Sequence, residues 1–275
     1  MASVKDIGFN MITVAYPAEP KYTVIGADSQ VVQVQVQPGE AVKCEPGTMM
    51  HMDPRFKSDV ELQPMCGCKS ACAGESCVKV TYTNSGDTPG YLGLTPNFPA
   101  KVVPLILAQG QRLRVKPKGY MAEIGDVDIG MNLDCCSKTC CCGGIGCIQQ
   151  SLTGKSPNLN VAFLAAGGTV MEKNLVDGEE IIVDMQSLVA WDSTVTYDLR
   201  LAGGLLTMCC AGEGMFVNVM KGPGRVVIQS MSFEKFCKAV APPPGAGAAG
   251  AGAGAAGAAA GGGGGAPETE EEMTR

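Results

Sequence analysis

The chain has 275 residues, 45% of them hydrophobic and 17% charged, a composition typical of one large or two small folded domains. Its 27 acidic and 21 basic residues give a net charge of −6. No basic patch suited to a phosphate backbone occurs in the sequence, so we expect no nucleic-acid partner. The sequence has a single histidine, His51, so any Ser-His or Cys-His catalysis would rest on this residue alone, and a zinc site built from several histidines is excluded. We therefore expect no enzymatic activity and no resident cofactor.

The sequence predicts no membrane-spanning helix. Its longest apolar runs are about a dozen residues, shorter than the ~20 that a spanning helix needs. The first residues contain Lys5 and Asp6 but no arginine, which is not typical of a mitochondrial presequence. Neither a signal peptide nor a glycosylation sequon accompanies the 14 cysteines, so we expect reduced thiols and a cytoplasmic location.

Short alternating runs broken by Gly and Pro predict strands along most of the chain. Val31–Gln37 and Arg225–Ser232 are the clearest examples. Ser232–Val240 predicts one short helix, with Ser232 as its N-cap. Residues 241–275 are rich in Gly and Ala and end in acidic residues, so this tail is predicted to be disordered.

Segments that align without gaps indicate an internal repeat. They begin at Gly39, Gly110 and Gly178, which are spaced by 71 and 68 residues, and each enters a strand after a turn. A second aligned set has spacings of 70 and 68 residues and surrounds Cys77, Cys147 and Met215. Because two separate sets of aligned segments have nearly the same period, the sequence predicts three units of about 70 residues each.

We therefore expect an all-β fold in which three pseudo-equivalent repeats bury their apolar faces around a pseudo-threefold axis. The expected architecture is a single β-prism or barrel-like domain of the double-stranded β-helix type. Its expected parts are a leading strand or strap at residues 1–30 and a domain at 31–240, with repeats at about 31–98, 102–170 and 174–240.

Three motifs, in this order, resemble the altered-inheritance-of-mitochondria family and its bacterial homologues. They are GTMMHMDP at Gly47–Pro54, YLGLTPNFPAKVVPLIL at Tyr91–Leu107 and GEGMFVNVMKGPGRVVIQS at Gly212–Ser230. The resemblance implies a fold similar to the tryptophan RNA-binding attenuator protein, with three such repeats in one chain. It also implies a homo-oligomer, a trimer being one form, and no enzymatic activity. A mitochondrial location and a role in mitochondrial membrane organisation are its further implications, although no presequence is visible.

The cysteines gather at corresponding places in the three repeats. Cys72, Cys142 and Cys210 are spaced by 70 and 68 residues, so the three clusters are predicted in equivalent loops at one pole of the prism. The clusters are Cys66, Cys68, Cys72 and Cys77; then Cys135, Cys136, Cys140, Cys141, Cys142 and Cys147; then Cys209 and Cys210.

Three interpretations of these clusters stay open. The thiols can be reduced packing residues, acylated anchors at a membrane surface, or thiolate ligands of Zn or Cu(I). The candidates for acylation are Cys135, Cys136, Cys140, Cys141, Cys142, Cys209 and Cys210. The candidate metal ligands are Cys66, Cys68, Cys72, Cys77, Cys135, Cys136, Cys140, Cys141, Cys142 and Cys147.

The function expected from the sequence is a non-enzymatic scaffold or adaptor that self-associates and attaches to a membrane surface through acylated loops. The alternative is a thiolate metal-binding protein. Phe98, in a proline-rich loop, is the candidate contact for a protein partner, or else part of a braced crossover between repeats. Glu123, Asp126 and Asp128 are predicted to lie on a solvated edge, and Trp191 is predicted to lie in the core.

Overall fold

The computed structural model describes residues 10–11, 21–62, 78–133, 148–201 and 216–241. Two compact units are distinguished, residues 1–235 and 236–275. All the strands, cores and pockets described below belong to the first unit.

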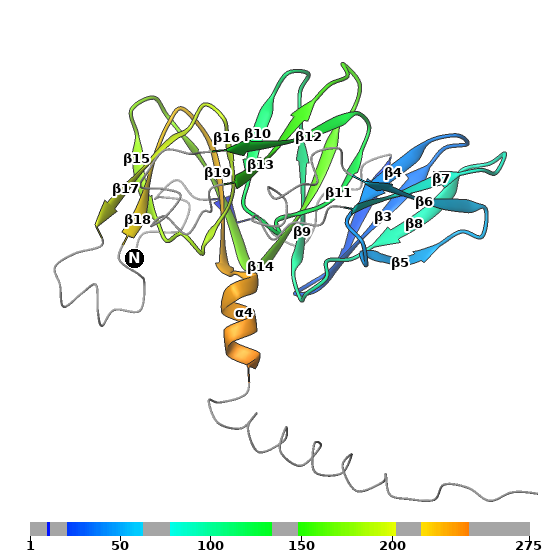
Figure 1. Ribbon diagram of the computed structural model, residues 1–275, viewed down its shortest axis with the longest axis horizontal. Coiled ribbons are helices and arrows are strands. Elements are labelled where there is room, and N and C mark those ends of the chain that lie inside the picture. The colour runs from blue at the N-terminus through cyan, green and yellow to red at the C-terminus, as the bar shows by residue number, and fades with distance from the viewer. Residues whose placement is uncertain (1–9, 12–20, 63–77, 134–147, 202–215, 242–275) are drawn as a thin grey trace, which may run out of the picture. The chain divides into compact units, whose positions relative to one another are not determined.

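Apart from one short helix, every helix or strand among the described residues is a β-strand (Figure 1), which confirms the all-β class. The elements are β1 (Asn10–Met11), β2 (Tyr22–Gly26), β3 (Gln30–Val36), β4 (Ala41–Cys44), β5 (Met49–Met52), β6 (Phe56–Leu62), β7 (Val78–Asn84), β8 (Gly90–Leu94), β9 (Lys101–Ile106), β10 (Arg112–Val115), β11 (Tyr120–Ile124), β12 (Val127–Leu133), β13 (Ile148–Gly154), β14 (Val161–Leu175), β15 (Glu180–Val183), β16 (Leu188–Asp192), β17 (Thr196–Leu201), β18 (Phe216–Lys221), β19 (Gly224–Met231) and α4 (Phe233–Val240).

The strands form open sheets. A twelve-stranded sheet follows the order β12-β13-β10-β16-β19-β14-β11-β4-β7-β6, and β1 and β9 pair with β14 beside this path. The other two described sheets have the orders β15-β18-β17 and β2-β3-β8-β5. In the described part of the chain, both of these smaller sheets end in edge strands. The closed prism or barrel that the sequence predicts is therefore not confirmed.

β14 is a fifteen-residue strand that takes part in two sets of pairings. Its first residues, Val161–Ala166, pair with β9, and Val161–Leu164 also pair with β11. From Gly167 onward it pairs with β19, and the register shifts between Gly167 and Val170. Gly168 has a φ of 68°, a left-handed conformation that glycine adopts without the steric penalty of a Cβ. The pair of glycines thus marks the place where the strand passes from one set of partners to the other.

Three clusters of buried side chains form the core. β3 illustrates the pattern that creates them, because its valines at 32, 34 and 36 are buried while the intervening residues are partly exposed. The second cluster is centred on Leu113, Leu152 and Leu164. The third contains Trp191, which is fully buried as predicted.

The predicted local elements agree with the structure where residues are described. The two alternating runs form β3 and β19, and the predicted short helix is α4. The Lys235 amide donates to the Ser232 hydroxyl at 3.1 Å, which confirms Ser232 as the N-cap. Part of the predicted leading strap forms β2, which pairs with β3. Among the described residues, no helix is long and apolar enough to cross a membrane.

Candidate functional site: a pocket beside a buried ion pair

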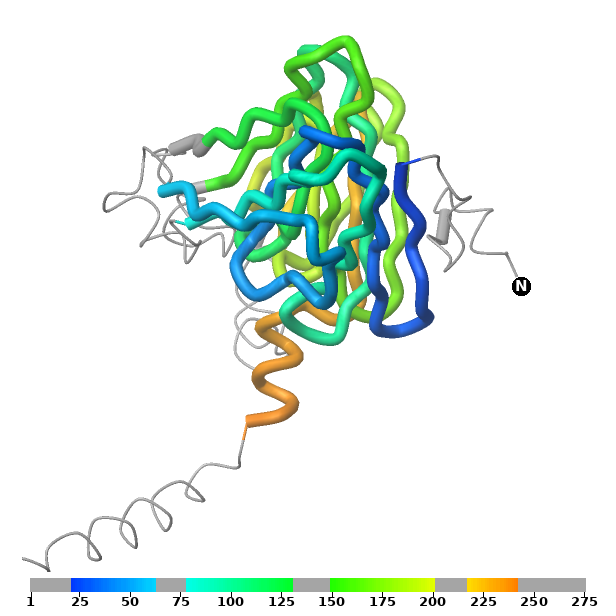
Figure 2. Tube along the Cα trace, turned by 90° about the vertical axis from the view of Figure 1, so that its right-hand side faces the viewer, coloured from blue at the N-terminus to red at the C-terminus, as the bar shows by residue number. Residues whose placement is uncertain are grey.

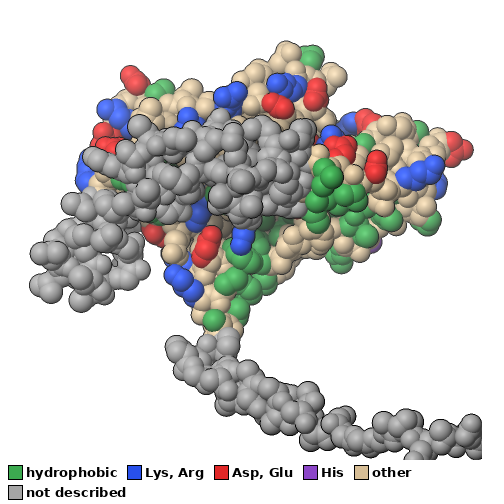
Figure 3. Space-filling view, viewed as in Figure 1, with side chains coloured by type: hydrophobic (Ala, Val, Ile, Leu, Met, Phe, Trp, Pro, Cys, Tyr) green, Lys and Arg blue, Asp and Glu red, His purple; other side chains and the backbone are tan. Residues whose placement is uncertain are grey.

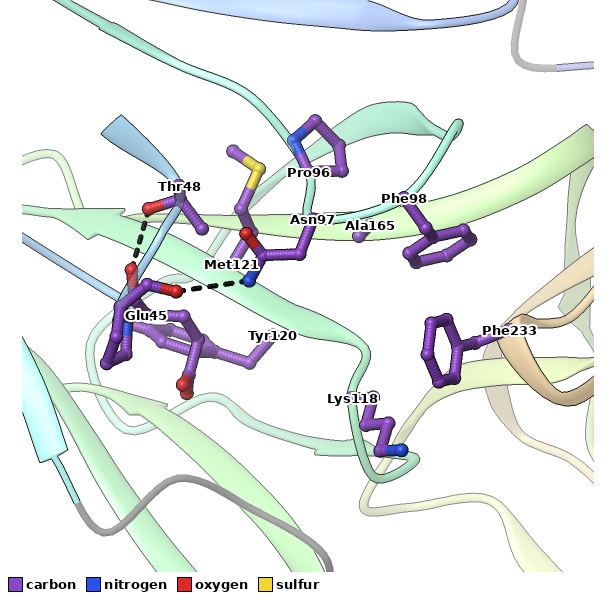
Figure 4. Close-up of a pocket in the computed structure, with 11 residues that line it drawn as sticks. Glu45, Thr48, Pro96, Asn97, Phe98, Lys118, Tyr120, Met121, Ala165 and Phe233 are labelled. Carbon is purple, nitrogen blue, oxygen red and sulfur yellow. Dashed lines mark hydrogen bonds between the residues drawn. The ribbon is translucent and has the colours of Figure 1, made fainter. Parts of the chain in front are cut away.

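A pocket of about 280 Å³ opens where two tight turns and the loop after β8 meet (Figure 4). One turn joins β4 to β5 and the other joins β10 to β11. The lining residues are Glu45, Pro46, Thr48, Pro96, Asn97, Phe98, Lys118, Tyr120, Met121, Ala165 and Phe233.

One wall of the pocket is aromatic. The Phe98 and Phe233 rings meet edge to face, with centroids 5.3 Å apart and planes inclined by 68° (Figure 4). The Lys118 ammonium lies 4.5 Å from the centroid of the Phe233 ring, a cation–π distance. Phe98 therefore packs against the residue that begins α4, and its contact with a partner protein stays a prediction.

Lys118 sits in a strained turn. The Gly119 amide donates to the Lys116 carbonyl at 3.0 Å, and Lys118 has a φ of 65°. In the corresponding turn between β4 and β5, Gly47 has a φ of 82°. A tight turn with a left-handed third residue normally carries glycine there, and a lysine costs roughly 1–2 kcal/mol. The turn between β10 and β11 is therefore strained at Lys118, and it places the ammonium group of this residue at the mouth of the pocket.

The opposite wall holds a buried ion pair. The Lys79 ammonium, only 2% exposed, pairs with the Glu45 carboxylate, whose side chain is 13% exposed. The same ammonium lies 4.1 Å from the centroid of the Tyr120 ring. Burial raises the pKa of Glu45, and the attraction of Lys79 opposes that rise.

Behind the pair lies a buried carboxyl group. The Tyr120 hydroxyl donates to Glu123 Oε2 at 3.2 Å, and burial raises the pKa of Glu123 to about 8. Glu123 is therefore not on a solvated edge, as the sequence predicted, but 3% exposed in the core. Asp126 and Asp128 are exposed, as expected. Since β11 is buried over its whole length, no alternation marks its inner and outer faces.

The cysteine clusters cannot be placed, because all twelve residues lie outside the described part of the chain. Within the described residues, no group of three or more His, Cys, Asp or Glu side chains is arranged to hold a metal ion. Cys44 is a buried free thiol on β4, and burial raises its pKa. His51 is exposed on β5.

The sequence does not predict the Lys79–Glu45 pair. In β7, VKVTYTN, alternation favours the valines as the inward-facing residues and the lysine as a solvated one. The structure buries Lys79 and Thr81 and leaves Val78 and Val80 partly exposed. No sequence signal distinguishes these two cases, because the inner face is defined by the strands of other segments.

Residues 22–231 match the mitochondrial biogenesis AIM24 family. The chain belongs to this family. An uncharacterized protein of Streptococcus pyogenes serotype M6 is 26% identical over 215 residues, which cover 75% of this chain and 83% of that protein. The X-ray structure of another Streptococcus pyogenes protein shares the fold of this AIM24-family chain, with a TM-score of 0.62. It is 23% identical and the match covers 80% of this chain and 97% of that one.

Proposed function

We propose that this AIM24-family chain is a non-enzymatic β scaffold of three repeats that assembles with further copies of itself. The proposal is supported by a pairing pattern that occurs three times. The strands divide into three sets of six, β3 to β8, β9 to β14 and β14 to β19, with β14 shared by the last two. In each set, the second and fourth strands pair with the fifth, and the first and third strands pair with the sixth.

One further pairing joins consecutive sets. The third strand of a set pairs with the second strand of the preceding set, as β11 does with β4 and β16 does with β10. Both third strands are deeply enclosed, since all five residues of β11 and four of the five in β16 are buried. We refer to these two pairings as the internal joints.

The observation that carries the proposal is the exposure of β5, the third strand of the first set. All four of its residues are exposed, and Met49, Met50 and Met52 are 38%, 60% and 37% exposed. Among the described residues no strand pairs with its outer edge. Hydrophobic side chains are also visible at the surface of the unit in Figure 3. An exposed, apolar edge strand is a template for pairing with another chain.

The oligomeric state tests this proposal. Light scattering after size-exclusion chromatography of the full reduced chain, over a dilution series, should give a mass that is a multiple of 28.4 kDa. A 28.4 kDa monomer at every concentration up to about 100 μM would contradict self-association, since the edge would then be too weak to support assembly.

The absence of catalysis is part of the same proposal. Its support is that the strongly buried polar side chains around the pocket satisfy one another. Glu45 pairs with Lys79, and Tyr120 donates to Glu123. Such pairs are expected of a core that encloses polar groups in stable contacts.

Attachment to a membrane through acylated cysteines is a second candidate property. It is favoured by the strands that flank the three clusters, because each cluster lies between two strands that pair with each other: β6 with β7, β12 with β13, and β17 with β18. The described ends of the first two of these strand pairs point to the same side in Figure 2. Acyl-exchange labelling of protein from its own cells should find modified cysteines, and elemental analysis tests the Zn or Cu(I) alternative.

A further inference from the structure

The pocket beside the buried ion pair has the size of a site for a small ligand. Its volume of about 280 Å³ is close to the lower limit of the ~300–1,000 Å³ that is typical of such sites. In Figure 4 the rings of Phe98 and Phe233 lie on one side of the pocket, and Glu45 and Thr48 lie on the other. The space between them suits a ligand with a short body.

The inner walls of the pocket are largely apolar. Five segments of the chain contribute to this lining: Pro96 and Phe98 follow β8, Met121 is on β11, Ala165 is on β14, and Phe233 begins α4. Met121 and Ala165 are buried, so they lie at the inner end of the pocket and not at its rim. The part of a ligand that reaches them is therefore expected to be apolar.

The polar groups of the inner walls already bond to the protein itself. The Thr48 hydroxyl donates to the Glu45 carbonyl at 2.8 Å, and the Glu45 carboxylate pairs with Lys79. The side-chain amide of Asn97 donates to the Pro46 carbonyl at 3.1 Å. A ligand rich in hydroxyl or amide groups would lose its hydrogen bonds to water here without replacing them, so sugars and nucleotides fit this pocket poorly.

Lys118 gives the mouth of the pocket a positive charge. Its side chain is exposed, whereas the neighbouring Lys116 is buried and pairs with Glu234 at 3.6 Å. Among the described residues, Lys118 is also the only residue other than glycine that has a positive φ. Strained backbone of this kind is concentrated at ligand clamps and other functional positions. The strain at Lys118 and the apolar cavity beside it are two separate observations that indicate a ligand.

We propose that this pocket binds a small organic anion, a monocarboxylate with a short alkyl chain or a single aromatic ring. The apolar body lies between the Phe98 and Phe233 rings and reaches Met121 and Ala165. The carboxylate stays at the mouth and bonds to the Lys118 ammonium, a charge-assisted contact. The same ammonium repels a cationic ligand. The inference is independent of the proposed self-association, because the pocket is formed within one chain.

The first test compares three probes that have the same eight-carbon chain. Isothermal titration calorimetry of the full reduced chain with octanoate should give a dissociation constant between about 10 μM and 1 mM. Octan-1-ol has no charge for Lys118 and should bind about tenfold more weakly or less tightly still. Octylammonium should not bind measurably. Equal affinities for the three probes would overturn the proposal.

Variants of Lys118 test the role of its charge. Lys118→Gln should weaken the binding of octanoate about tenfold and leave that of octan-1-ol unchanged, whereas Lys118→Arg should stay within about threefold of the wild type. Lys118→Gly relieves the positive φ, so it should lose affinity for octanoate without lowering the urea midpoint of unfolding. A purely structural role of this residue would not combine lost binding with retained stability.

Two further variants complete the set. Ala165→Val fills the inner end of the pocket and should weaken octanoate and octan-1-ol alike. Lys57→Gln is the matched control, because Lys57 is an exposed lysine on β6 that does not line the pocket, and this variant should bind like the wild type. Unchanged circular dichroism would show that each variant is folded.

Nuclear magnetic resonance of methyl-labelled Met and Ala locates the bound probe. Octanoate should shift the methyl signals of Met121 and Ala165 and leave those of Met50 and Met52, which are exposed on β5, in place. Octanoate that binds equally well to Lys118→Gln and Ala165→Val, or that shifts the β5 methyl signals instead, is adventitious and overturns the proposal.

The acidic segment Glu268–Glu272 of the same chain is the competing occupant. A wild type that does not bind octanoate, together with a variant carrying Gln at Glu270, Glu271 and Glu272 that does, would show that this segment fills the pocket. That result would overturn the proposal of a small carboxylate ligand. A wild type that binds octanoate at Met121 and Ala165 supports it.

Discussion

The Lys79 ammonium and the Glu45 carboxylate form an ion pair that connects β7 to the turn after β4, and Glu45 is one of the residues that line the pocket. Replacing Lys79 by Met leaves the carboxylate largely buried without its partner, which we expect to destabilise the protein by about 3 kcal/mol. Urea denaturation followed by circular dichroism measures the loss. The double variant Lys79→Met with Glu45→Gln should recover part of it, because no unpaired charge remains, whereas equal losses in both variants would contradict this explanation.

Glu123 should make the folded state less stable as the pH rises. Its pKa is raised from an ordinary value of 4.5 to about 8 in the folded protein, so between these values the folded chain holds a proton that the unfolded chain releases. Stability should fall across this window by up to ~1.4 kcal/mol per pH unit and level off above about pH 8. Glu123→Gln keeps an acceptor for the Tyr120 hydroxyl and removes the titration. Denaturation at pH 5, 6, 7 and 8 should show a steeper decline for the wild type than for this variant; parallel curves would refute the prediction.

The edge-to-face contact of Phe98 with Phe233 should stabilise the folded protein by more than the burial of the two rings alone would. A double-mutant cycle with Phe98→Ala and Phe233→Ala is expected to give a coupling of about 0.5–1.5 kcal/mol. The free energy of unfolding of all four proteins measures it. Additive losses would mean that the two rings are stabilised independently.

Gly167 should not tolerate a side chain. A Cβ at this position would lie 2.1 Å from the Met231 carbonyl oxygen, which belongs to the paired backbone of β19 and cannot turn away. We expect Gly167→Ala to destabilise the protein by about 2 kcal/mol or more. Gly178→Ala provides a contrast, because the added Cβ there meets nothing within 4 Å and only the φ of 76° resists it. A loss no larger at Gly167 than at Gly178 would show that β19 shifts to make room.

The local patterns of the sequence determined much of the fold. Alternating valines predicted β3, Ser232 predicted the start of α4, and apolar alternation around Trp191 predicted its burial. These signals are local, since each depends on residues within one strand or one helical turn. The all-β class follows from many such segments taken together.

The candidate site depended on contacts that no local pattern encodes. Lys79 and Glu123 are buried because strands from distant segments cover them. The partner of Lys79, Glu45, lies in the turn after β4, 34 residues away, whereas Glu123 accepts from Tyr120 of its own strand, β11. Charged residues in alternating strands ordinarily face water, so the sequence predicted Glu123 on a solvated edge. The sequence also could not predict that the sheets are open. The spacing of the repeats indicates equivalent units, but it does not indicate whether the last unit pairs with the first.

β14 has a consequence for how the protein unfolds. In arrays of self-contained modules, one module can open while its neighbours stay folded. Here the residues on either side of Gly167 and Gly168 pair with different neighbours along one continuous strand, so fraying at one end removes support from the other. The strand therefore acts as a mechanical tie. When the chain is pulled from its ends, we expect one large unfolding event at this strand, and not a series of small ones.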